Sequence, residues 1–281
     1  MIEDFLSSLA ESHLLARAGG LLRKLPYPFA NTFVGVGDVK LCAHTYDRFA
    51  ALWLWKWGLL EKFELGLIRS LALEGAQVVD IGANIGLYTL IFSEMVGVEG
   101  KVWAFEPEAG NFACLQKNAA ANGCANISLQ ALGVSEQSGA ASLYVSQIHQ
   151  GDHQIYPSDQ PRQKVDVQLV ALDDFFAPGQ RIDLIKMDIQ GAEGLALRGM
   201  ARLLQSNPGL KLFMEFWPTG LVRGGSDPLQ VLSQLAGYGY KLEVLDESSG
   251  QLKPLDAPQE LVQSLLARKK YVNLLATAPD G

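Results

Sequence analysis

The pattern of apolar and polar positions changes near residue 75. From Gln77 onward, short apolar runs alternate with longer amphipathic segments, which is typical of parallel strands covered by helices on both faces. We expect strands at 78–81, 101–105, 127–132, 182–187, 210–215, 241–245 and 271–276, and helices at 87–95 and 109–121. Two alternating runs, 141–145 and 164–170, predict a hairpin inserted within about 135–180.

The first 74 residues follow a different pattern. Apolar residues at helical spacing predict an opening helix from Ile2 to about Arg17, and residues 33–45 indicate a short hairpin with glycines near its turn. An aromatic stretch, in which we expect Trp53, Trp55 and Trp57 in a core or interface, leads into a helix near 61–71. Because such apolar faces need a partner, we expect residues 1–74 to form a cap or a homo-oligomer contact on a domain spanning 75–281. A membrane-surface helix is the alternative, disfavoured because basic residues come late, from Arg17 onward.

Composition narrows the classes of function. The chain has 281 residues, 48% hydrophobic and 19% charged, an ordinary globular balance, and its net charge of −7 disfavours a nucleic-acid partner, which needs a basic patch. The three cysteines lack zinc-site spacing, so we expect free thiols and no metal. Glu3 and Asp4 replace the basic start of a secretory signal, and the most apolar stretch, 49–60, is too short to span a bilayer. We therefore expect a cytoplasmic protein.

The most informative string runs from Asp80 to Gly86, Asp-Ile-Gly-Ala-Asn-Ile-Gly, between an apolar strand and an amphipathic helix. In open parallel sheets, ligands bind beyond the carboxyl ends of such strands. A dinucleotide fingerprint would place glycine where Asn84 stands, and the charge of Asp80 suits a pyrophosphate poorly. Both residues suit the ammonium, carboxylate and sulfonium of S-adenosylmethionine. A nicotinamide-dependent oxidoreductase is the disfavoured alternative, and simple helix capping by Asp80 and Asn84 is another.

Two further strand ends complete the expected cofactor site. Glu106 ends the second strand, where a carboxylate can accept hydrogen bonds from both ribose hydroxyls. The amide of Gln130, or the backbone at Ala131 and Leu132, could pair with the adenine edge after the third strand. Gln130 could equally be an exposed strand residue.

Four sequence blocks resemble the FkbM family of methyltransferases. They are Asp-Ile-Gly-Ala-Asn-Ile-Gly-Leu-Tyr-Thr (80–89), Phe-Glu-Pro (105–107), Ala-Leu-Gly (131–133) and Lys-Met-Asp-Ile-Gln-Gly-Ala-Glu (186–193), with Gln190 where glutamate is commoner. The resemblance covers about 75–277 and, more weakly, the helix with Glu61 and Glu64 before it. It implies a class I, Rossmann-like α/β fold: a seven-stranded, mostly parallel sheet with its last strand antiparallel and helices on both faces. It also implies methyl transfer from S-adenosylmethionine to a small-molecule acceptor, often a hydroxyl of a sugar, polyketide or other natural product. Within the first block we expect cofactor contacts from Asp80, Gly82, Asn84, Gly86 and Thr89.

Candidate groups for activating the acceptor stand at the ends of the fourth and fifth strands and in the insertion. Asp188 and Glu215 end those strands, and His153 lies in the polar insertion. Because a hydroxyl must lose its proton, we expect these three side chains to be catalytic, with Asp188 closest to the methyl group. Asp188 could instead cap the next helix, Glu215 could be an ion-pair partner and His153 a surface residue. Asp188 and Glu215 could share a magnesium ion, which nothing in the sequence demands.

A non-catalytic cofactor-binding or protein-interaction module would not need these acids, so their presence favours an enzyme.

Overall fold

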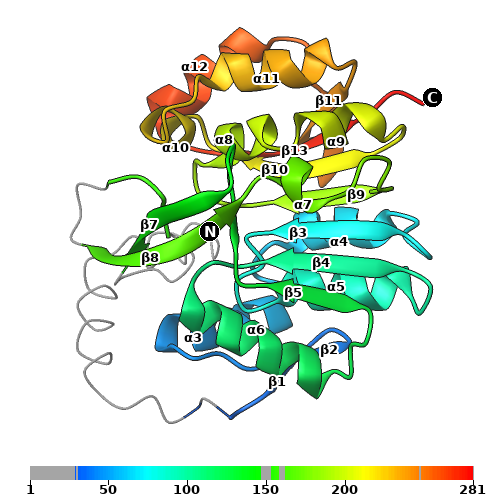
Figure 1. Cartoon of the computed structure of the whole chain (residues 1–281), viewed down its shortest axis with the longest axis vertical. Coiled ribbons are helices and arrows are strands. Elements are labelled where there is room, and N and C mark those ends of the chain that lie inside the picture. The colour runs from blue at the N-terminus through cyan, green and yellow to red at the C-terminus, as the bar shows by residue number, and fades with distance from the viewer. Residues whose placement is uncertain (1–28, 30, 147–152, 158–161, 247, 281) are drawn as a thin grey trace.

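An eight-stranded twisted sheet forms the centre of the computed structural model (Figure 1), which describes residues 29, 31–146, 153–157, 162–246 and 248–280. The expected opening helix at 2–17 lies outside the described residues. The strand order is β12-β11-β13-β10-β9-β3-β4-β5. In that order the strands are Gln251–Pro254, Lys241–Asp246, Val272–Thr277, Lys211–Phe216, Leu184–Met187, Gln77–Ile81, Lys101–Phe105 and Ile127–Gln130.

The strand directions confirm the expected α/β fold. β5, β4, β3, β9 and β10 run parallel, while β13 runs antiparallel to both of its neighbours, β10 and β11. These seven strands match the expected seven within two residues at each end. The eighth, β12, pairs antiparallel with β11 at the edge of the sheet. Three of its four residues are exposed and only Leu252 is half-buried, so no apolar alternation marks it in the sequence.

Two apolar clusters cover the two faces of the sheet. Val79 and Ile81 of β3 face one cluster, which includes helices α7 (Leu172–Phe175), α8 (Glu193–Arg198), α9 (Ala201–Ser206), α10 (Pro218–Arg223), α11 (Pro228–Gly237) and α12 (Pro258–Arg268). Val78 faces the other, which includes α3 (Tyr46–Lys56), α4 (Lys62–Ser70), α5 (Leu87–Val96) and α6 (Ala109–Ala121). Because both faces of β3 are buried, its sequence is a continuous apolar run with one charge, Asp80.

The segment before β3 packs onto the second cluster. The expected hairpin is confirmed as β1 (Val34–Val36) and β2 (Val39–Leu41), with Gly37 at φ +59° in its turn. Leu52 of α3 and Ile68 of α4 are fully buried against the sheet. Of the three tryptophans of the aromatic stretch, Trp55 is buried, Trp53 is half-buried and Trp57 is exposed. We propose that this segment is a cap that depends on the main domain for its stability.

The expected insertion forms a second, smaller sheet. β7 (Gly139–Ser146) and β8 (Arg162–Val170) pair antiparallel, and the short β6 (Gly133–Val134) pairs parallel with β8. Figure 1 shows β7 and β8 standing apart from the main sheet. The third strand of the main sheet ends at Gln130 and not at Leu132, because the chain turns there to enter this second sheet.

Two asparagines of α6 and its C-cap, one helical turn apart, attach β2 to the main domain. The Asn118 side chain accepts a hydrogen bond from the Cys42 N–H at 2.8 Å and donates to the carbonyls of Cys42 (3.0 Å) and Ile85 (2.7 Å). The Asn122 side chain makes the same pair of bonds with the N–H and carbonyl of Lys40, at 2.8 and 2.7 Å. Asn118 is fully buried, whereas the bonds of Asn122 are exposed to water.

Replacing Asn118 tests the dependence of the cap on the main domain. Asn118→Ala removes the partner of the buried Cys42 N–H and Ile85 carbonyl and leaves the Cys42 carbonyl only the Cys114 thiol, so we expect the free energy of unfolding to fall by about 2–4 kcal/mol. Asn122→Ala is the matched control and should cost about 1 kcal/mol or less, because water replaces the lost partners. Urea unfolding followed by circular dichroism measures both. A separate early transition in Asn118→Ala, with the main transition unchanged, would show that the cap is an independent unit.

Candidate functional site

A cavity of about 280 Å³ lies beyond the carboxyl ends of β3, β4, β9 and β10. The turn after β3 and the end of β4 form one side, and the ends of β9 and β10 form another. α3 and the residue before α4 contribute Arg48, Trp55 and Glu61, and the insertion contributes Leu143, His153, Ile155 and Leu169. Parallel strands present their carboxyl ends at one edge of the sheet, which is why side chains far apart in the sequence meet here.

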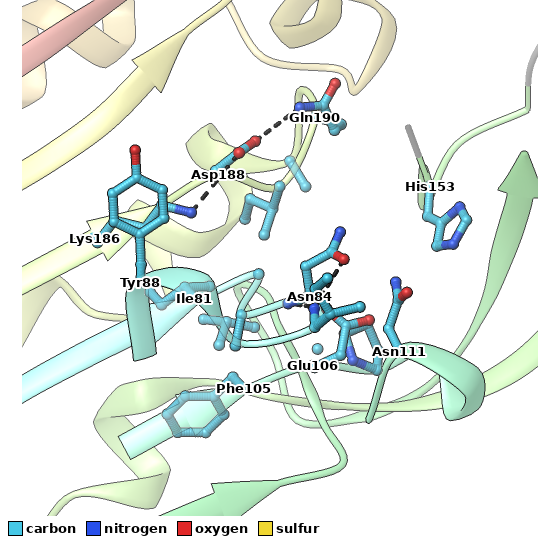
Figure 2. A pocket seen from close by; sticks show the side chains of 18 of the residues that line it. Ile81, Asn84, Tyr88, Phe105, Glu106, Asn111, His153, Lys186, Asp188 and Gln190 are labelled. Atoms are coloured by element: carbon cyan, nitrogen blue, oxygen red, sulfur yellow. Dashed lines mark hydrogen bonds and ion pairs between the residues drawn. The ribbon is translucent and has the colours of Figure 1, made fainter. Parts of the chain in front are cut away.

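The turn after β3 requires a glycine at position 82. Gly82 has φ +79°, and a Cβ atom there would lie 2.0 Å from the carbonyl oxygen of Asp188. Asn84 also adopts a left-handed conformation, at φ +53°, which asparagine tolerates better than most residues. Its backbone N–H therefore points to β4, where it donates to Oε2 of Glu106 at 2.8 Å. Figure 2 shows Asn84 and Glu106 next to each other in the cavity lining.

Glu106 is a buried carboxyl group at the cavity wall. Its Oε1 accepts a hydrogen bond from the Glu108 N–H at 2.9 Å, so both oxygens are held by backbone amides. Burial raises the pKa of Glu106 to about 7, although the amides of Glu108 and Asn84 lower it. Asn111, on the first turn of α6, is 1% exposed and lines the cavity beside it. Its Oδ1 is buried with no hydrogen-bond partner within the described ranges, so a donor on a ligand would satisfy it.

Asp80 lies beneath this turn and does not line the cavity. It is fully buried, and its Oδ2 accepts a hydrogen bond from Thr89 Oγ1 at 2.6 Å. Its Oδ1 lies 3.9 Å from Nζ of Lys186. Burial raises the pKa of Asp80, and Lys186 and Thr89 oppose that change. Asp80, Thr89 and Gly86 support the turn from below.

The residues expected at the adenine edge lie outside the cavity lining. Gln130 Nε2 donates to Ser128 Oγ at 3.0 Å, Ala131 is exposed and Leu132 packs against the first apolar cluster. The next two residues, Gly133 and Val134, line the cavity in their place. The chain turns after Gln130, which shifts the lining by two residues.

Three polar side chains are linked at the ends of β9 and β10. Gln190 Nε2 donates to Asp188 Oδ1 at 2.7 Å and to Glu215 Oε1 at 3.3 Å. Lys186 Nζ lies 3.8 Å from Asp188 Oδ2 and 4.8 Å from the centre of the Tyr88 ring. The first turn of α8 has no side-chain cap, so Asp188 does not cap that helix. Figure 2 shows Asp188 between Lys186 and Gln190.

Burial and neighbouring charges shift the acids around Lys186. Burial raises the pKa of Glu215 well above its ordinary value, and the charge of Asp188 raises it further. The pKa of Glu61 is also raised by burial, against a hydrogen bond with Tyr88 and the charge of Lys186. Burial alone would lower the pKa of Lys186, but the surrounding carboxylates outweigh it and the pKa is raised. The arrangement therefore favours the charged form of Lys186 and the protonated form of Glu215.

His153 lines the cavity from the insertion. Its Nδ1 accepts a hydrogen bond from the Ser146 N–H at 3.2 Å, which sets the orientation of the ring. In Figure 2 it lies across the cavity from Lys186 and Asp188, on the side of Asn84 and Asn111. The structure thus brings all three candidate catalytic residues to one cavity, and Gln190 links two of them, Asp188 and Glu215.

Several lining residues were not expected from the sequence. Glu61, Tyr88, Asn111 and Lys186 all contact or line this cavity. Lys186 precedes Asp188 by two residues on β9, so alternation along a strand was a usable signal for it. Asn111, Tyr88 and Glu61 carried no such signal, because only the packing of α6, α5 and the α3–α4 segment decides which side chains face inward.

The described residues contain neither a membrane-spanning helix nor a cluster of metal ligands. None of the helices in the described part of the chain combines the length and apolar character that crossing a bilayer requires. Within the same residues, no group of three or more histidine, cysteine, aspartate or glutamate side chains is arranged to hold a metal ion.

Comparison with known proteins gives a family match and several relatives. Residues 80–242, more than half of the chain, match the family described as Methyltransferase FkbM domain. Methyltransferase 1 of Beauveria bassiana (strain ARSEF 2860) is 26% identical over 144 residues, and Methyltransferase sdnD of Sordaria araneosa is 28% identical over 155. Each match covers 44% of this chain, which spans only 57% and 60% of those relatives. Among crystal structures, Methyltransferase FkbM from Methylobacillus flagellatus KT is 19% identical, covering 74% of this chain and 45% of that chain, with a TM-score of 0.47.

Replacing Gly82 tests the close approach between the turn and the end of β9. In Gly82→Ala the new methyl group meets a backbone carbonyl, so we expect a loss of at least about 3 kcal/mol in the free energy of unfolding. Gly225→Ala is the matched control, because Gly225 has nearly the same φ, +82°, with nothing within 4 Å of a Cβ. It should lose only about 1 kcal/mol, from backbone strain alone. Equal losses in urea unfolding would contradict the close approach.

Proposed function

Because the chain belongs to the Methyltransferase FkbM domain family, we propose that it transfers a methyl group from S-adenosylmethionine to a hydroxyl oxygen of a small molecule. Sugars, polyketides and related natural products are the acceptor classes we would test first. The observation that carries the proposal is the buried Glu106 carboxyl at the cavity wall, held by the amides of Asn84 and Glu108. A carboxylate in that place can accept hydrogen bonds from both hydroxyls of a ribose.

The residues around the cavity fit the cofactor. Gly82 lines the cavity, and its lack of a side chain lets the turn after β3 lie against the Asp188 carbonyl, where even a methyl group would collide. The unsatisfied Asn111 Oδ1 offers an acceptor for a donor on the cofactor. The side chain at Asn84 occupies the place where a dinucleotide-binding turn needs glycine, which disfavours a pyrophosphate. We propose that Gly82, Asn84, Glu106 and Asn111 contact the cofactor directly, with Asp80, Gly86 and Thr89 behind them.

S-adenosylmethionine supplies an activated methyl group on a sulfonium, so the protein has to hold the acceptor in line and manage one proton. We propose that Asp188 orients the acceptor hydroxyl and takes up its proton, because its carboxylate is 41% exposed at the cavity. Lys186 keeps a positive charge near that carboxylate. Because burial raises the pKa of Glu215, its protonated form is favoured and can donate a hydrogen bond to the acceptor, and His153 contacts it from the insertion.

Two other functions remain testable alternatives. A non-catalytic cofactor-binding or protein-interaction module would keep Glu106 and Gly82 without using Asp188. A nicotinamide-dependent oxidoreductase would bind NADH in the same cavity. Micromolar binding of NADH with no binding of S-adenosylhomocysteine would favour the oxidoreductase, and cofactor binding without turnover on any acceptor would favour the module.

Calorimetric titration with S-adenosylhomocysteine tests the cofactor site. Glu106→Ala should weaken binding by on the order of 1–3 kcal/mol, the value of hydrogen bonds to a charged acceptor. Glu260→Ala, an exposed acid on α12, is the control and should bind like the wild type. Since the pKa of Glu106 is about 7 and ribose hydroxyls favour its ionised form, binding should release a proton near pH 6 and weaken as the pH falls. Titrations in buffers of different ionisation enthalpy measure that proton, and its persistence in Glu106→Ala would rule out Glu106 as the source.

Three variants compared side by side test acceptor activation. Asp188→Asn keeps the shape and the bond from Gln190 but removes the charge, so turnover should fall by ~10²-fold or more with cofactor affinity nearly unchanged. Glu215→Gln and His153→Ala should have smaller effects, because neither combines exposure with a nearby cation as Asp188 does. Turnover is measured with the best acceptor from a screen of sugar, polyketide and peptide compounds. Near-wild-type turnover in all three variants would mean that positioning alone accounts for catalysis.

A further inference from the structure

We propose that Gln190 is a positioning residue, whose amide holds Asp188 and Glu215 in one fixed arrangement and whose backbone is fixed by Tyr156 of the insertion. The proposal rests on the proposed function, since it concerns how the acceptor-activating carboxylate is oriented. It adds that the insertion contributes to catalysis through Gln190 as well as by lining the cavity.

A single amide nitrogen joins the two acids. Gln190 Nε2 carries two hydrogens, one for Asp188 Oδ1 at 2.7 Å and one for Glu215 Oε1 at 3.3 Å. Lys186 lies 3.8 Å from Asp188, too far for a hydrogen bond, so it contributes charge but does not fix direction. The orientation of the Asp188 carboxylate therefore depends on Gln190.

The surroundings favour a neutral donor at this position. Further acids approach the pair from several elements: Glu61 before α4, Glu193 on α8 and Asp80 on β3. Lys186 on β9 is the cation nearest to Asp188 among the described side chains, Tyr88 on α5 stacks on that cation, and Arg48 and His153 line the cavity opposite. A third carboxylate in place of the amide would repel the Asp188 carboxylate and raise the pKa of Glu215 further, whereas an amide bonds to both without adding charge.

The Gln190 backbone is held in a strained conformation by contacts on three sides. Its φ is +53°, a left-handed value that a non-glycine residue adopts only when its surroundings impose it. Tyr156 Oη donates to the Gln190 carbonyl at 2.8 Å, and Glu193 Oε1 accepts from the N–H groups of Ile189 and Gly191 at 3.1 and 3.2 Å. At Gly191, φ +98°, a Cβ would lie 2.5 Å from the Gly220 backbone. The side chain of Gln190 is thus aimed by the fold.

The first experiment tests the hydrogen bonds from Gln190 to Asp188 and Glu215 in the absence of cofactor and acceptor. We would follow the Glu215 carboxyl by carbon-13 NMR across pH, identifying its signal with Glu215→Gln. Gln190→Met keeps the length and the backbone strain but removes both hydrogen bonds, so the Glu215 midpoint should rise by on the order of one pH unit. Gln190→Glu adds a like charge and should raise it further. Gln168→Glu, on the exposed face of β8, is the charge control and should leave the midpoint unchanged. Equal midpoints in all four proteins would overturn the proposal.

The second experiment measures kcat to test whether Gln190 positions the Asp188 carboxylate for catalysis. With the acceptor from the screen, Gln190→Met should lower kcat about tenfold, with cofactor affinity unchanged and no new pH dependence. In Gln190→Glu, kcat should be lowest at high pH and recover at low pH, because the protonated glutamate again donates a hydrogen bond. Tyr156→Phe should lower kcat several-fold with the pH profile retained. A merely structural Gln190 would give Met and Glu variants with equal losses and identical profiles.

The two experiments separate failure of this inference from failure of the proposed function. Absence of methyl transfer by the wild type on every acceptor would contradict the proposed function, while the NMR titration would still decide whether Gln190 bridges the acids. Methyl transfer by the wild type, with unchanged Glu215 titration and unchanged kcat in both Gln190 variants, would refute the bridge and leave the function standing.

Discussion

A buried cation between two carboxylates sets the geometry of the central strands. The register of β3 and β9 places Asp80 directly beside Lys186, and both side chains are almost completely buried. Burying either charge alone would cost several kcal/mol, so each requires the other, together with the hydroxyl of Thr89 and the ring of Tyr88. A shift of register by one residue would separate the two charges and turn them to opposite faces. Gly82 in the turn after β3 lies two residues beyond Asp80, and Asp188 at the end of β9 lies two residues beyond Lys186. The positions of both therefore follow from this pair.

Backbone strain is concentrated around the cavity. Four non-glycine residues of the described chain have positive φ, and three of them, Glu61, Asn84 and Gln190, line the cavity. In each of them the left-handed backbone directs a side chain or a backbone N–H group toward the site, and an ordinary backbone conformation would direct it elsewhere. Strain of this kind costs about 1–3 kcal/mol per residue and persists only where the surrounding packing imposes it. The apolar clusters on the two faces of the sheet therefore stabilise a site that its local sequence does not favour.

The sequence predicted what is encoded locally and missed what depends on packing between distant segments. β3, α5, β4 and α6 were placed within two residues, because buried parallel strands and amphipathic helices leave periodic signals. Asp188 and Glu106 could be found because a strand end in such a sheet always faces the ligand. Asn111 and Glu61 could not, since their inward direction depends on how a helix and the cap pack. Gln130 was expected at the site, but a turn after it directs the next residues there instead.

The paired asparagines Asn118 and Asn122 have a consequence for the behaviour of the protein in a crowded solution. β2 is the outer strand of a two-stranded hairpin, and such a strand exposes N–H and carbonyl groups that can recruit a strand from another molecule. Here the backbone N–H and carbonyl groups of Lys40 and Cys42 are already hydrogen-bonded to the side-chain amides of Asn122 and Asn118. Helical side chains thus complete the edge as a neighbouring strand would, but they offer no further edge of their own. The β2 edge of the hairpin is therefore closed to pairing with a foreign strand by the helix that anchors it.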